Sequence, residues 1–215
     1  TANIEFQQMT GLSMANFNGS MLSPYQQLLP TRPEVFSFNQ MWNEACGGDD
    51  SCSVGFHPFL QRFYLRNANY KKFKFSHLYT LDSDPKIKHA GTYEGKSGKS
   101  GNVTDEQAYQ NVIDEVRANA QANKPAQFIE LVTMQNHAPY PGIYGDENEF
   151  FAADMSNVPD GEKGVIGNYA KGVQRTDEAT KQFLDELDAI DKPITVVFYG
   201  DHLPGIYKTA GADEK

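Results

Sequence analysis

Two apolar segments, each preceded by a helix-forming segment, most strongly constrain the fold of this chain. The first reads AQFIELVTM at residues 126–134, and the second reads PITVVFYG at residues 193–200. A helix that begins at Thr104 and runs to about Ala122 precedes the first segment, and a helix over residues 167–190 precedes the second. Nearly continuous apolar strands that alternate with helices are typical of a parallel sheet buried on both faces. We therefore predict an α/β fold, with a largely parallel or mixed sheet covered by helices on both faces.

Weaker signals divide the rest of the chain. Four segments have helical periodicity or the composition of a short buried strand: helices over Ile4–Met14, residues 34–44 and Phe59–Ala68, and a strand around Cys52–Phe56. Gly, Lys and Ser dominate residues 85–102, and Pro, Gly, Asn and Asp are frequent in residues 138–163, so we predict loops there. Without an internal repeat or a run of 18 apolar residues, the chain reads as one domain.

The charge of the chain excludes one class of partner. The formal net charge is −9 and the isoelectric point lies near 5.0. An acidic surface argues against non-specific binding to nucleic acid or to an anionic membrane. It leaves room for a local cationic pocket that binds a phosphate.

Cys46 and Cys52 enclose the short stretch GGDDS. In an exported protein they would close this loop as a disulfide, and otherwise they are two unpaired thiols. Both interpretations stay open. The pair does not match a zinc site, because no second pair of Cys or His lies at zinc-binding spacing.

Polar side chains follow both predicted strands at their carboxyl ends, where α/β folds place their sites. Asp201 and His202 come directly after Gly200, and His137 follows the first strand. A carboxylate beside a neutral imidazole suits a divalent cation such as Mn²⁺ or Zn²⁺. The alternative is that Asp201 caps a helix beside a surface histidine and that His137 is structural.

His57 and Arg66 flank the predicted helix in HPFLQRFYLR. Nine residues apart, they could converge on an anion, because a guanidinium makes bidentate contacts with phosphate. The alternative is a solvated helix that carries Arg62 and Arg66 on its surface.

Four motifs, taken together and in this order, resemble the lipoteichoic acid synthase family. They are TANIEF at Thr1–Phe6, HPFLQRFYLR at His57–Arg66, TMQNHAPY at Thr133–Tyr140 and FYGDHLPG at Phe198–Gly205. This family comprises extracellular, sulfatase-like phosphoglycerol transferases of the alkaline phosphatase superfamily. The resemblance spans nearly the whole chain and implies the same α/β fold and a metal-dependent transfer of a phosphoryl group.

The resemblance also assigns roles to individual residues. Thr1 matches the family's nucleophile, which is also a metal ligand, and Asp201 and His202 match two further ligands of a single Mn²⁺ or Mg²⁺ ion. A threonine, rather than a Cys or Ser converted to formylglycine, argues against a true sulfatase. Four residues match the groups that hold the phosphoglycerol head: His57, Tyr64, Arg66 and His137. His137 is also our candidate for protonating the leaving oxygen.

The family's substrates and location are implied in the same way. We expect glycerophosphate to move from phosphatidylglycerol to a glycolipid or polymer acceptor at the extracellular face of the bacterial cell membrane, in a protein that is membrane-anchored at full length. The family's remaining metal ligand is a Glu on a strand upstream of the nucleophile, and the family has a C-terminal subdomain. We therefore expect residues 1–215 to be a single catalytic domain that lacks both parts.

Two alternatives remain at this point. Tyr64 stands where some family members carry Trp, which leaves open a hydrolase or a transferase of another head group such as phosphoethanolamine. A non-catalytic domain that binds wall polymer is the alternative from a different class, and the presence of Thr1, Asp201 and His202 together argues against it.

Overall fold

A three-stranded parallel sheet forms the centre of the protein. The computed structural model describes residues 2–48, 52–140, 142–145, 148–152 and 154–206. The strands are β1 (Ser53–Phe56), β2 (His77–Tyr79) and β5 (Phe128–Leu131), in the order β2-β1-β5. Val54 of β1 lies opposite His77 on one side and Ile129 on the other. The strand expected around Cys52–Phe56 and the strand within residues 126–134 are both confirmed.

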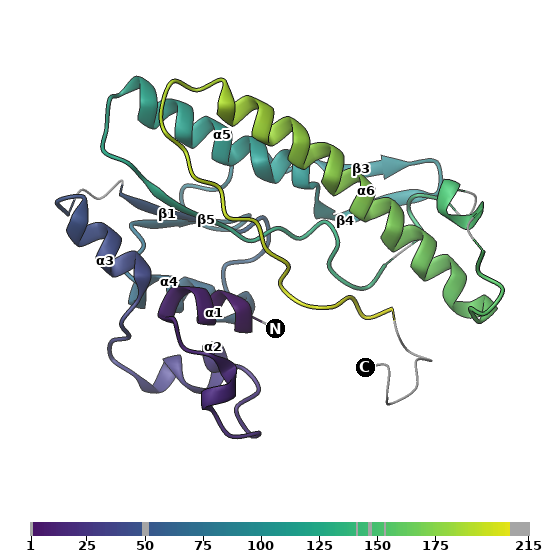
Figure 1. The fold of residues 1–215 in the computed structure, drawn as a ribbon, viewed down its shortest axis with the longest axis horizontal. Helices are drawn as coiled ribbons and strands as arrows, with labels where there is room; N and C mark the ends of the chain where they lie inside the picture. Colours follow the sequence, from purple (N-terminus) through teal and green to yellow (C-terminus); the bar gives the residue numbers. More distant parts are fainter. Residues whose placement is uncertain (1, 49–51, 141, 146–147, 153, 207–215) are drawn as a thin grey trace.

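Helices cover both faces of this sheet (Figure 1). The long helices α5 (Asp105–Gln121) and α6 (Asp160–Asp188) pack side by side on one face. The shorter helices lie on the other face: α1 (Asn3–Thr10), α2 (Pro24–Gln27), α3 (Phe38–Ala45) and α4 (Arg66–Lys72). This two-sided arrangement confirms the predicted fold class.

Successive side chains of β1 point to opposite faces of the sheet, and this explains how each face is packed. Val54 and Phe56 point toward α5 and pack with Val112. Gly55 points the other way, where a Cβ atom would lie 2.6 Å from the Tyr70 ring of α4. Glycine at this position therefore allows α4 to approach the sheet closely. The core on that side also contains Phe6, Tyr25, Leu29 and Phe73.

Local signals locate the start of α5 and of α3. The Thr104 hydroxyl accepts a hydrogen bond from the Gln107 N–H at 3.4 Å, as expected for an N-cap, and α5 ends at Gln121. Ser37 caps α3 in the same way, by accepting from the Gln40 N–H at 3.2 Å. Because of this cap, α3 begins at Phe38 instead of residue 34. The expected helix over Ile4–Met14 is shorter, since Gly11 adopts a left-handed conformation that ends α1.

The prediction of a loop over residues 85–102 is wrong in its second half. Strands β3 (Thr92–Gly95) and β4 (Gly98–Val103) form an antiparallel hairpin there, joined by a two-residue turn. The Gly, Lys and Ser residues of this segment give no apolar alternation, so composition conceals the strands. Gly98, with φ of 150°, accommodates the turn.

The chain around the expected helix Phe59–Ala68 and the expected loop 138–163 also differs from prediction. A 3₁₀ turn (Phe63–Leu65) comes first, and α4 begins only at Arg66. Short 3₁₀ turns also occur at Met14–Asn16, Leu29–Thr31 and Glu149–Ala152. Helix α6 begins at Asp160, earlier than residue 167, so the loop before it is shorter than predicted.

The strand predicted over residues 193–200 is wrong. This segment runs past the edge strand β5 (Figure 1), but no strand pairs with it among the described residues. Val197 and Phe198 are 75% and 68% exposed. A strand requires a neighbour that accepts and donates its ladder of hydrogen bonds, which apolar composition alone does not provide. The segment is held to the sheet through a side chain, Tyr199, whose hydroxyl donates to Glu130.

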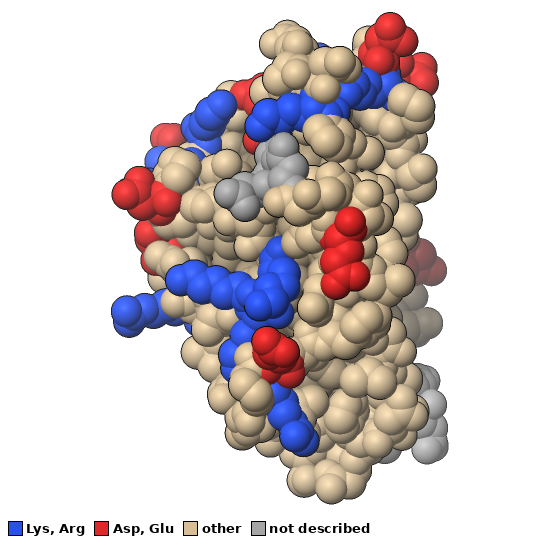
Figure 2. Space-filling view, turned by 90° about the vertical axis from the view of Figure 1, so that its left-hand side faces the viewer, with Lys and Arg blue, Asp and Glu red and all other residues tan. Residues whose placement is uncertain are grey.

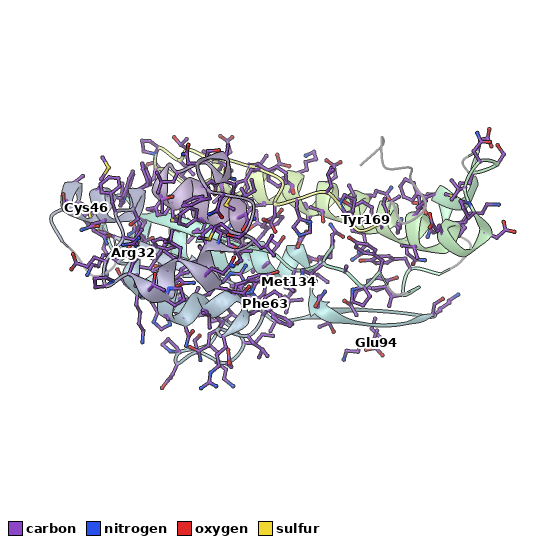
Figure 3. The ribbon with its side chains drawn as sticks, turned by 90° about the horizontal axis from the view of Figure 1, so that it is seen from below. Arg32, Cys46, Phe63, Glu94, Met134 and Tyr169 are labelled. Atoms are coloured by element: carbon purple, nitrogen blue, oxygen red, sulfur yellow. A yellow bond between two sulfur atoms is a disulfide. The ribbon has the colours of Figure 1, made fainter. Side chains whose placement is uncertain are left out.

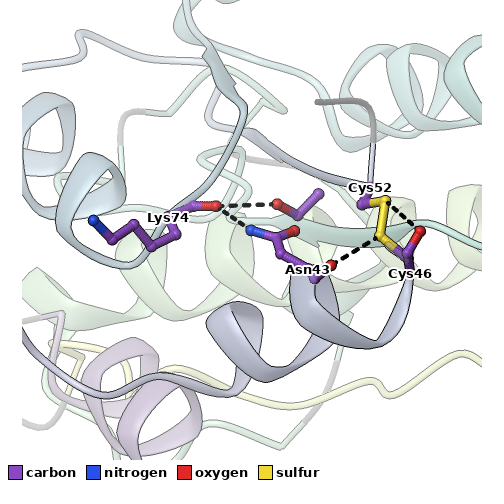
Figure 4. Close-up of a disulfide and its surroundings, with 5 residues drawn as sticks. Asn43, Cys46, Cys52 and Lys74 are labelled. Carbon is purple, nitrogen blue, oxygen red and sulfur yellow. Dashed lines mark hydrogen bonds between the residues drawn. A yellow bond between two sulfur atoms is a disulfide. The ribbon is translucent and has the colours of Figure 1, made fainter. Parts of the chain in front are cut away.

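Cys46 and Cys52 form a disulfide, which decides between the two interpretations of this pair. Beside it, the amide of Asn43 donates a hydrogen bond to the Lys74 carbonyl oxygen (Figure 4). The disulfide thus joins the end of α3 to the start of β1. Such a crosslink is typical of proteins that fold in an oxidising compartment. Of the helices in the described residues, none has the length and apolarity needed to cross a membrane.

Candidate active site

Arg66 and Glu5 form a buried ion pair between α4 and α1. The Arg66 Nε donates to Glu5 Oε2 at 3.0 Å, and Nη2 donates to Oε1. The two residues are only 3% and 2% exposed. Burial alone lowers the pKa of Arg66, but the Glu5 carboxylate raises it above its ordinary value. The guanidinium is therefore permanently charged and fixed in position.

His57 lies beneath Arg66 and is fully buried. Its Nδ1 is 3.0 Å from the Val132 carbonyl oxygen, and its Nε2 is 3.0 Å from Arg66 Nη1. A carbonyl oxygen only accepts and a guanidinium only donates, so the proton is on Nδ1 and Nε2 accepts. Burial and then the charge of Arg66 lower the pKa of His57 to about 3. His57 is thus a neutral support for Arg66.

A strained turn sets the direction of Arg66. Tyr64 and Leu65 have φ of 54° and 56°, in the left-handed region that few side chains adopt. Arg66 then begins α4 with its guanidinium carbon 5.6 Å from the Phe63 ring centre and 5.5 Å from that of Tyr64. The turn therefore brings two aromatic rings against the charge of Arg66.

Phe63 connects His137 to Glu5, His57, Tyr64 and Arg66, which we call the Arg66 cluster. Its ring stacks on that of His57, with centres 6.3 Å apart, and meets the ring of His137 edge-on at 5.8 Å. Figure 3 labels Phe63 and Met134 in the middle of the molecule and Tyr169 on α6. The structure thus brings His57, Tyr64, Arg66 and His137 into one region, and their role in holding a phosphoglycerol head stays a prediction.

A hydrogen-bond network fixes the segment that carries His137. Gln135 Nε2 and Asn136 Nδ2 donate to the Thr176 hydroxyl at 3.0 and 2.8 Å. Thr176 in turn donates to the buried carboxylate of Asp105 at 2.5 Å. His137 Nδ1 lies 2.6 Å from the Ala138 carbonyl oxygen and must donate to it. In the neutral ring, Nε2 is therefore left as a proton acceptor.

Asp201 and His202 lie side by side, with His202 Nε2 3.4 Å from Asp201 Oδ2. His202 Nδ1 is 2.8 Å from the Leu203 carbonyl oxygen and must donate to it, so in the neutral ring Nε2 carries a lone pair. Burial raises the pKa of Asp201; the charge of a protonated His202 lowers it, the Glu5 carboxylate raises it and Arg66 lowers it. These influences show that Asp201 lies within electrostatic reach of the Glu5–Arg66 pair.

The donors at Asp201 and His202 fit a divalent cation. Asp201 Oδ1 is buried and has no hydrogen-bond partner among the described residues, which is costly for a carboxylate oxygen without a cation. An imidazole with a lone pair on Nε2 is the second suitable donor. No third Asp, Glu, His or Cys of the described residues joins them. Thr1, the third predicted ligand, lies outside the described residues.

Glu130 is a buried carboxyl group at the edge of the same region. It lies on β5 opposite Gly55, and the Tyr199 hydroxyl donates to its Oε1 at 2.5 Å. Burial raises the pKa of Glu130 to about 7, and Glu5 adds to the shift, while Tyr199 and Arg66 oppose it. The ordinary pKa of 4.5 applies to the unfolded chain. The folded protein therefore holds the Glu130 proton more tightly than the unfolded chain does.

The raised pKa of Glu130 makes stability fall as pH rises. Below pH 4.5 both states are protonated. Between pH 4.5 and about 7 the unfolded chain releases this proton while the folded protein keeps it, so folding requires the uptake of a proton and stability falls as pH rises. We expect this group to reduce the free energy of unfolding by about 3 kcal/mol at pH 8 relative to pH 4. Glu130→Gln should remove this loss in urea titrations at both pH values, and the exposed Glu94→Gln should keep it. Identical pH profiles for Glu130→Gln and the wild type would contradict the prediction.

Basic side chains gather at the opposite end of the sheet. Figure 2 shows Lys and Arg in bands across the end of the molecule that lies at the left of Figure 1. Helix α4 ends there with Lys71 and Lys72, and Lys72 donates to the carbonyl oxygen of Arg32 at 2.8 Å. The positive charge of the candidate site therefore comes from Arg66 itself, and not from this basic surface.

Glu5 and Phe63 are the residues of this site that sequence reasoning missed. Both fall within the motifs TANIEF and HPFLQRFYLR, which singled out other residues. One signal pointed to Glu5: it is a carboxylate in an otherwise apolar and polar-uncharged helix, next to Phe6. A buried carboxylate needs a cationic partner, and Arg66 is one of the few arginines of the chain.

Comparison with known proteins agrees with this geometry. The family model described as Sulfatase matches residues 1–215. A putative cyclic beta-1,2-glucan modification protein of Rhizobium meliloti is 28% identical over 98% of this chain and 30% of its own length. The capsular polysaccharide biosynthesis protein RkpI of the same organism is 29% identical over 69% of this chain and 23% of its own length. The chain thus spans less than a third of these relatives.

Two solved structures have the same fold. The phosphoglycerol transferase GacH of Streptococcus pyogenes, in complex with sn-glycerol-1-phosphate, is 28% identical, with a TM-score of 0.74 over 96% of this chain and 49% of that chain. The lipoteichoic acid synthase LtaP of Listeria monocytogenes is 19% identical, with a TM-score of 0.59 over 87% of this chain and 40% of that chain. The second likeness concerns the fold alone.

Proposed function

Because this chain belongs to the Sulfatase family, we propose that it is the catalytic part of a metal-dependent phosphoglycerol transferase. The observation that carries the proposal is the grouping of Arg66, His57 and His137 near Asp201, in a chain similar to a phosphoglycerol transferase that binds sn-glycerol-1-phosphate. A fixed cation beside cation-binding oxygens suits a phosphoryl group.

We assign a role to each group at this site. Asp201, His202 and Thr1 would hold a Mn²⁺ or Mg²⁺ ion, which when bound lowers the pKa of a coordinated hydroxyl and polarises a phosphoryl oxygen. Arg66 uses four of its N–H groups within the described protein, which leaves one on Nη2 for the substrate. Tyr64 would line the glycerol, and His57 would hold Arg66 in place.

The reaction we propose has two halves. The Thr1 oxygen attacks the phosphorus of phosphatidylglycerol, the bond to diacylglycerol breaks, and His137 passes the Thr1 proton to the departing oxygen. An acceptor hydroxyl then attacks the same phosphorus, the bond to Thr1 breaks, and His137 returns a proton to Thr1. The hydroxyl of Thr1 is thereby restored, and glycerophosphate has moved from lipid to acceptor.

The acceptor that we favour is a saccharide, on a glycolipid or a polymer. Both curated relatives have names that refer to saccharides, a cyclic glucan and a capsular polysaccharide. We place the reaction at the extracellular face of the bacterial membrane, where the lipid donor is available. The disulfide between Cys46 and Cys52 is compatible with that oxidising location.

Release of diacylglycerol from phosphatidylglycerol vesicles tests the proposal. We expect the full-length protein to release diacylglycerol, to lose this activity after treatment with EDTA and to regain it with Mn²⁺. Vesicles of phosphatidylethanolamine are the matched control. Release from these vesicles alone would indicate a phosphoethanolamine transferase, and undiminished release after metal removal would contradict the role of the cation.

A further inference from the structure

A cavity adjoins His137, and neither Arg66 nor Phe63 lines it. Its volume is about 160 Å³, and it lies between β4, the segment after β5, and α6. Its walls include Tyr140, Tyr144, Tyr169, Asn102 and Asn168. This space has room for several water molecules, which suits a single sugar ring and is too small for a lipid chain.

The chemistry of this cavity differs from that of the Arg66 cluster. Among the described residues that line it, none is Lys, Arg, Asp or Glu. The lining instead combines tyrosine rings with side-chain amides. An amide offers both donors and acceptors, which match a hydroxyl group that donates and accepts. Aromatic rings present flat apolar faces with a polar edge. This combination favours a neutral, polyhydroxylated ligand.

The polar groups are held in position before any ligand binds. Asn168 Oδ1 accepts from the Tyr144 N–H at 3.0 Å, and Nδ2 donates to the Gly164 carbonyl oxygen at 3.0 Å. The described residues leave one N–H and one lone pair of this amide for a ligand. Tyr140 and Tyr169 meet edge-on with ring centres 5.1 Å apart. Preorganisation of this kind reduces the entropy lost on binding.

We infer that this cavity, which we call the neutral pocket, binds a sugar ring of the acceptor and directs one of its hydroxyls toward the phosphoryl group. The inference rests on the proposed function. His137 is the shared wall, since it lines the pocket and also contacts Phe63 of the Arg66 cluster. Its Nε2 accepts the proton as the sugar oxygen bonds to phosphorus and the bond from phosphorus to Thr1 breaks; the proton then passes to Thr1.

Two variants in the walls of the pocket test the inference: Asn102→Ala on β4 and Tyr169→Ala on α6. The matched control is Lys181→Ala, at an exposed residue of α6. The probe is a short β-1,2-linked glucose oligomer, added to the full-length protein with phosphatidylglycerol vesicles. We expect each pocket variant to raise the acceptor KM by about tenfold or more. Lys181→Ala should leave the acceptor KM within about twofold of the wild type.

Direct binding of the same oligomer, measured by calorimetry without lipid, separates this inference from the proposed function. Binding that both pocket variants weaken supports the pocket, even if the wild type releases no diacylglycerol and the proposed function fails. Wild-type transfer with an unchanged acceptor KM in both pocket variants would overturn the pocket and leave the proposed function intact. Absence of binding and of transfer to the oligomer would also overturn it.

Discussion

Glu5→Gln is expected to lower the free energy of unfolding by roughly 3–5 kcal/mol, because it leaves a buried guanidinium without its counter-charge. Arg66 is 3% exposed and donates two hydrogen bonds to the Glu5 carboxylate. A glutamine fills the same space and can accept one of these bonds, but carries no charge. Urea titration followed by circular dichroism measures the difference directly.

Two further variants distinguish the loss of the buried ion pair from the general effect of removing a carboxylate. Glu34→Gln changes an exposed residue of the same N-terminal region and should alter stability by less than about 0.5 kcal/mol. Replacing both partners with apolar side chains, in Glu5→Leu with Arg66→Met, should recover much of the lost stability, since no charge is then left buried. This second variant should not recover transfer. A Glu5→Gln protein as stable as the wild type would show that Arg66 does not depend on Glu5.

Elements with signals close together in the chain were predictable. The start of α5 was found from Thr104, because its capping hydrogen bond is made within four residues. Strand β5 was found from its apolar run after Pro125. The β3–β4 hairpin was missed because its stability depends on pairing across the turn rather than on an apolar pattern. The helix expected over Phe59–Ala68 was misplaced because no local sequence signal predicts the left-handed turn at Tyr64 and Leu65.

Residues 193–200 show the limit of composition most clearly. Their apolar side chains have the pattern of a buried strand, yet Val197 and Phe198 are exposed and no described strand pairs with the segment. Pairing is a property of two segments, and a sequence pattern describes one. The same limit applies to Glu5, whose partner Arg66 is 61 residues away. The predicted site residues came from strand ends, from residue spacing and from family motifs, whereas the supporting ion pair and the neutral pocket required the folded chain.

Thr1→Ala is expected to reduce phosphoglycerol transfer by roughly 10³-fold or more, because it removes the proposed nucleophile and leaves only binding and electrostatic stabilisation. Thr1→Ser is the matched control, since it keeps a hydroxyl at the same position and should retain measurable transfer. The assay is diacylglycerol release by the full-length protein from phosphatidylglycerol vesicles. A nucleophile also predicts a chemical intermediate, which activity alone does not report.

Intact-protein mass spectrometry after incubation with phosphatidylglycerol, without acceptor, should show the wild type carrying one added phosphoglycerol group. Thr1→Ala should carry none, and addition of a saccharide acceptor should remove the group from the wild type as transfer completes. An adduct on Thr1→Ala would place the nucleophile elsewhere in the chain. Transfer without any adduct in the wild type would instead indicate direct attack by the acceptor on the lipid. In that case His137, between the Arg66 cluster and the neutral pocket, would be left as the group that takes the acceptor's proton.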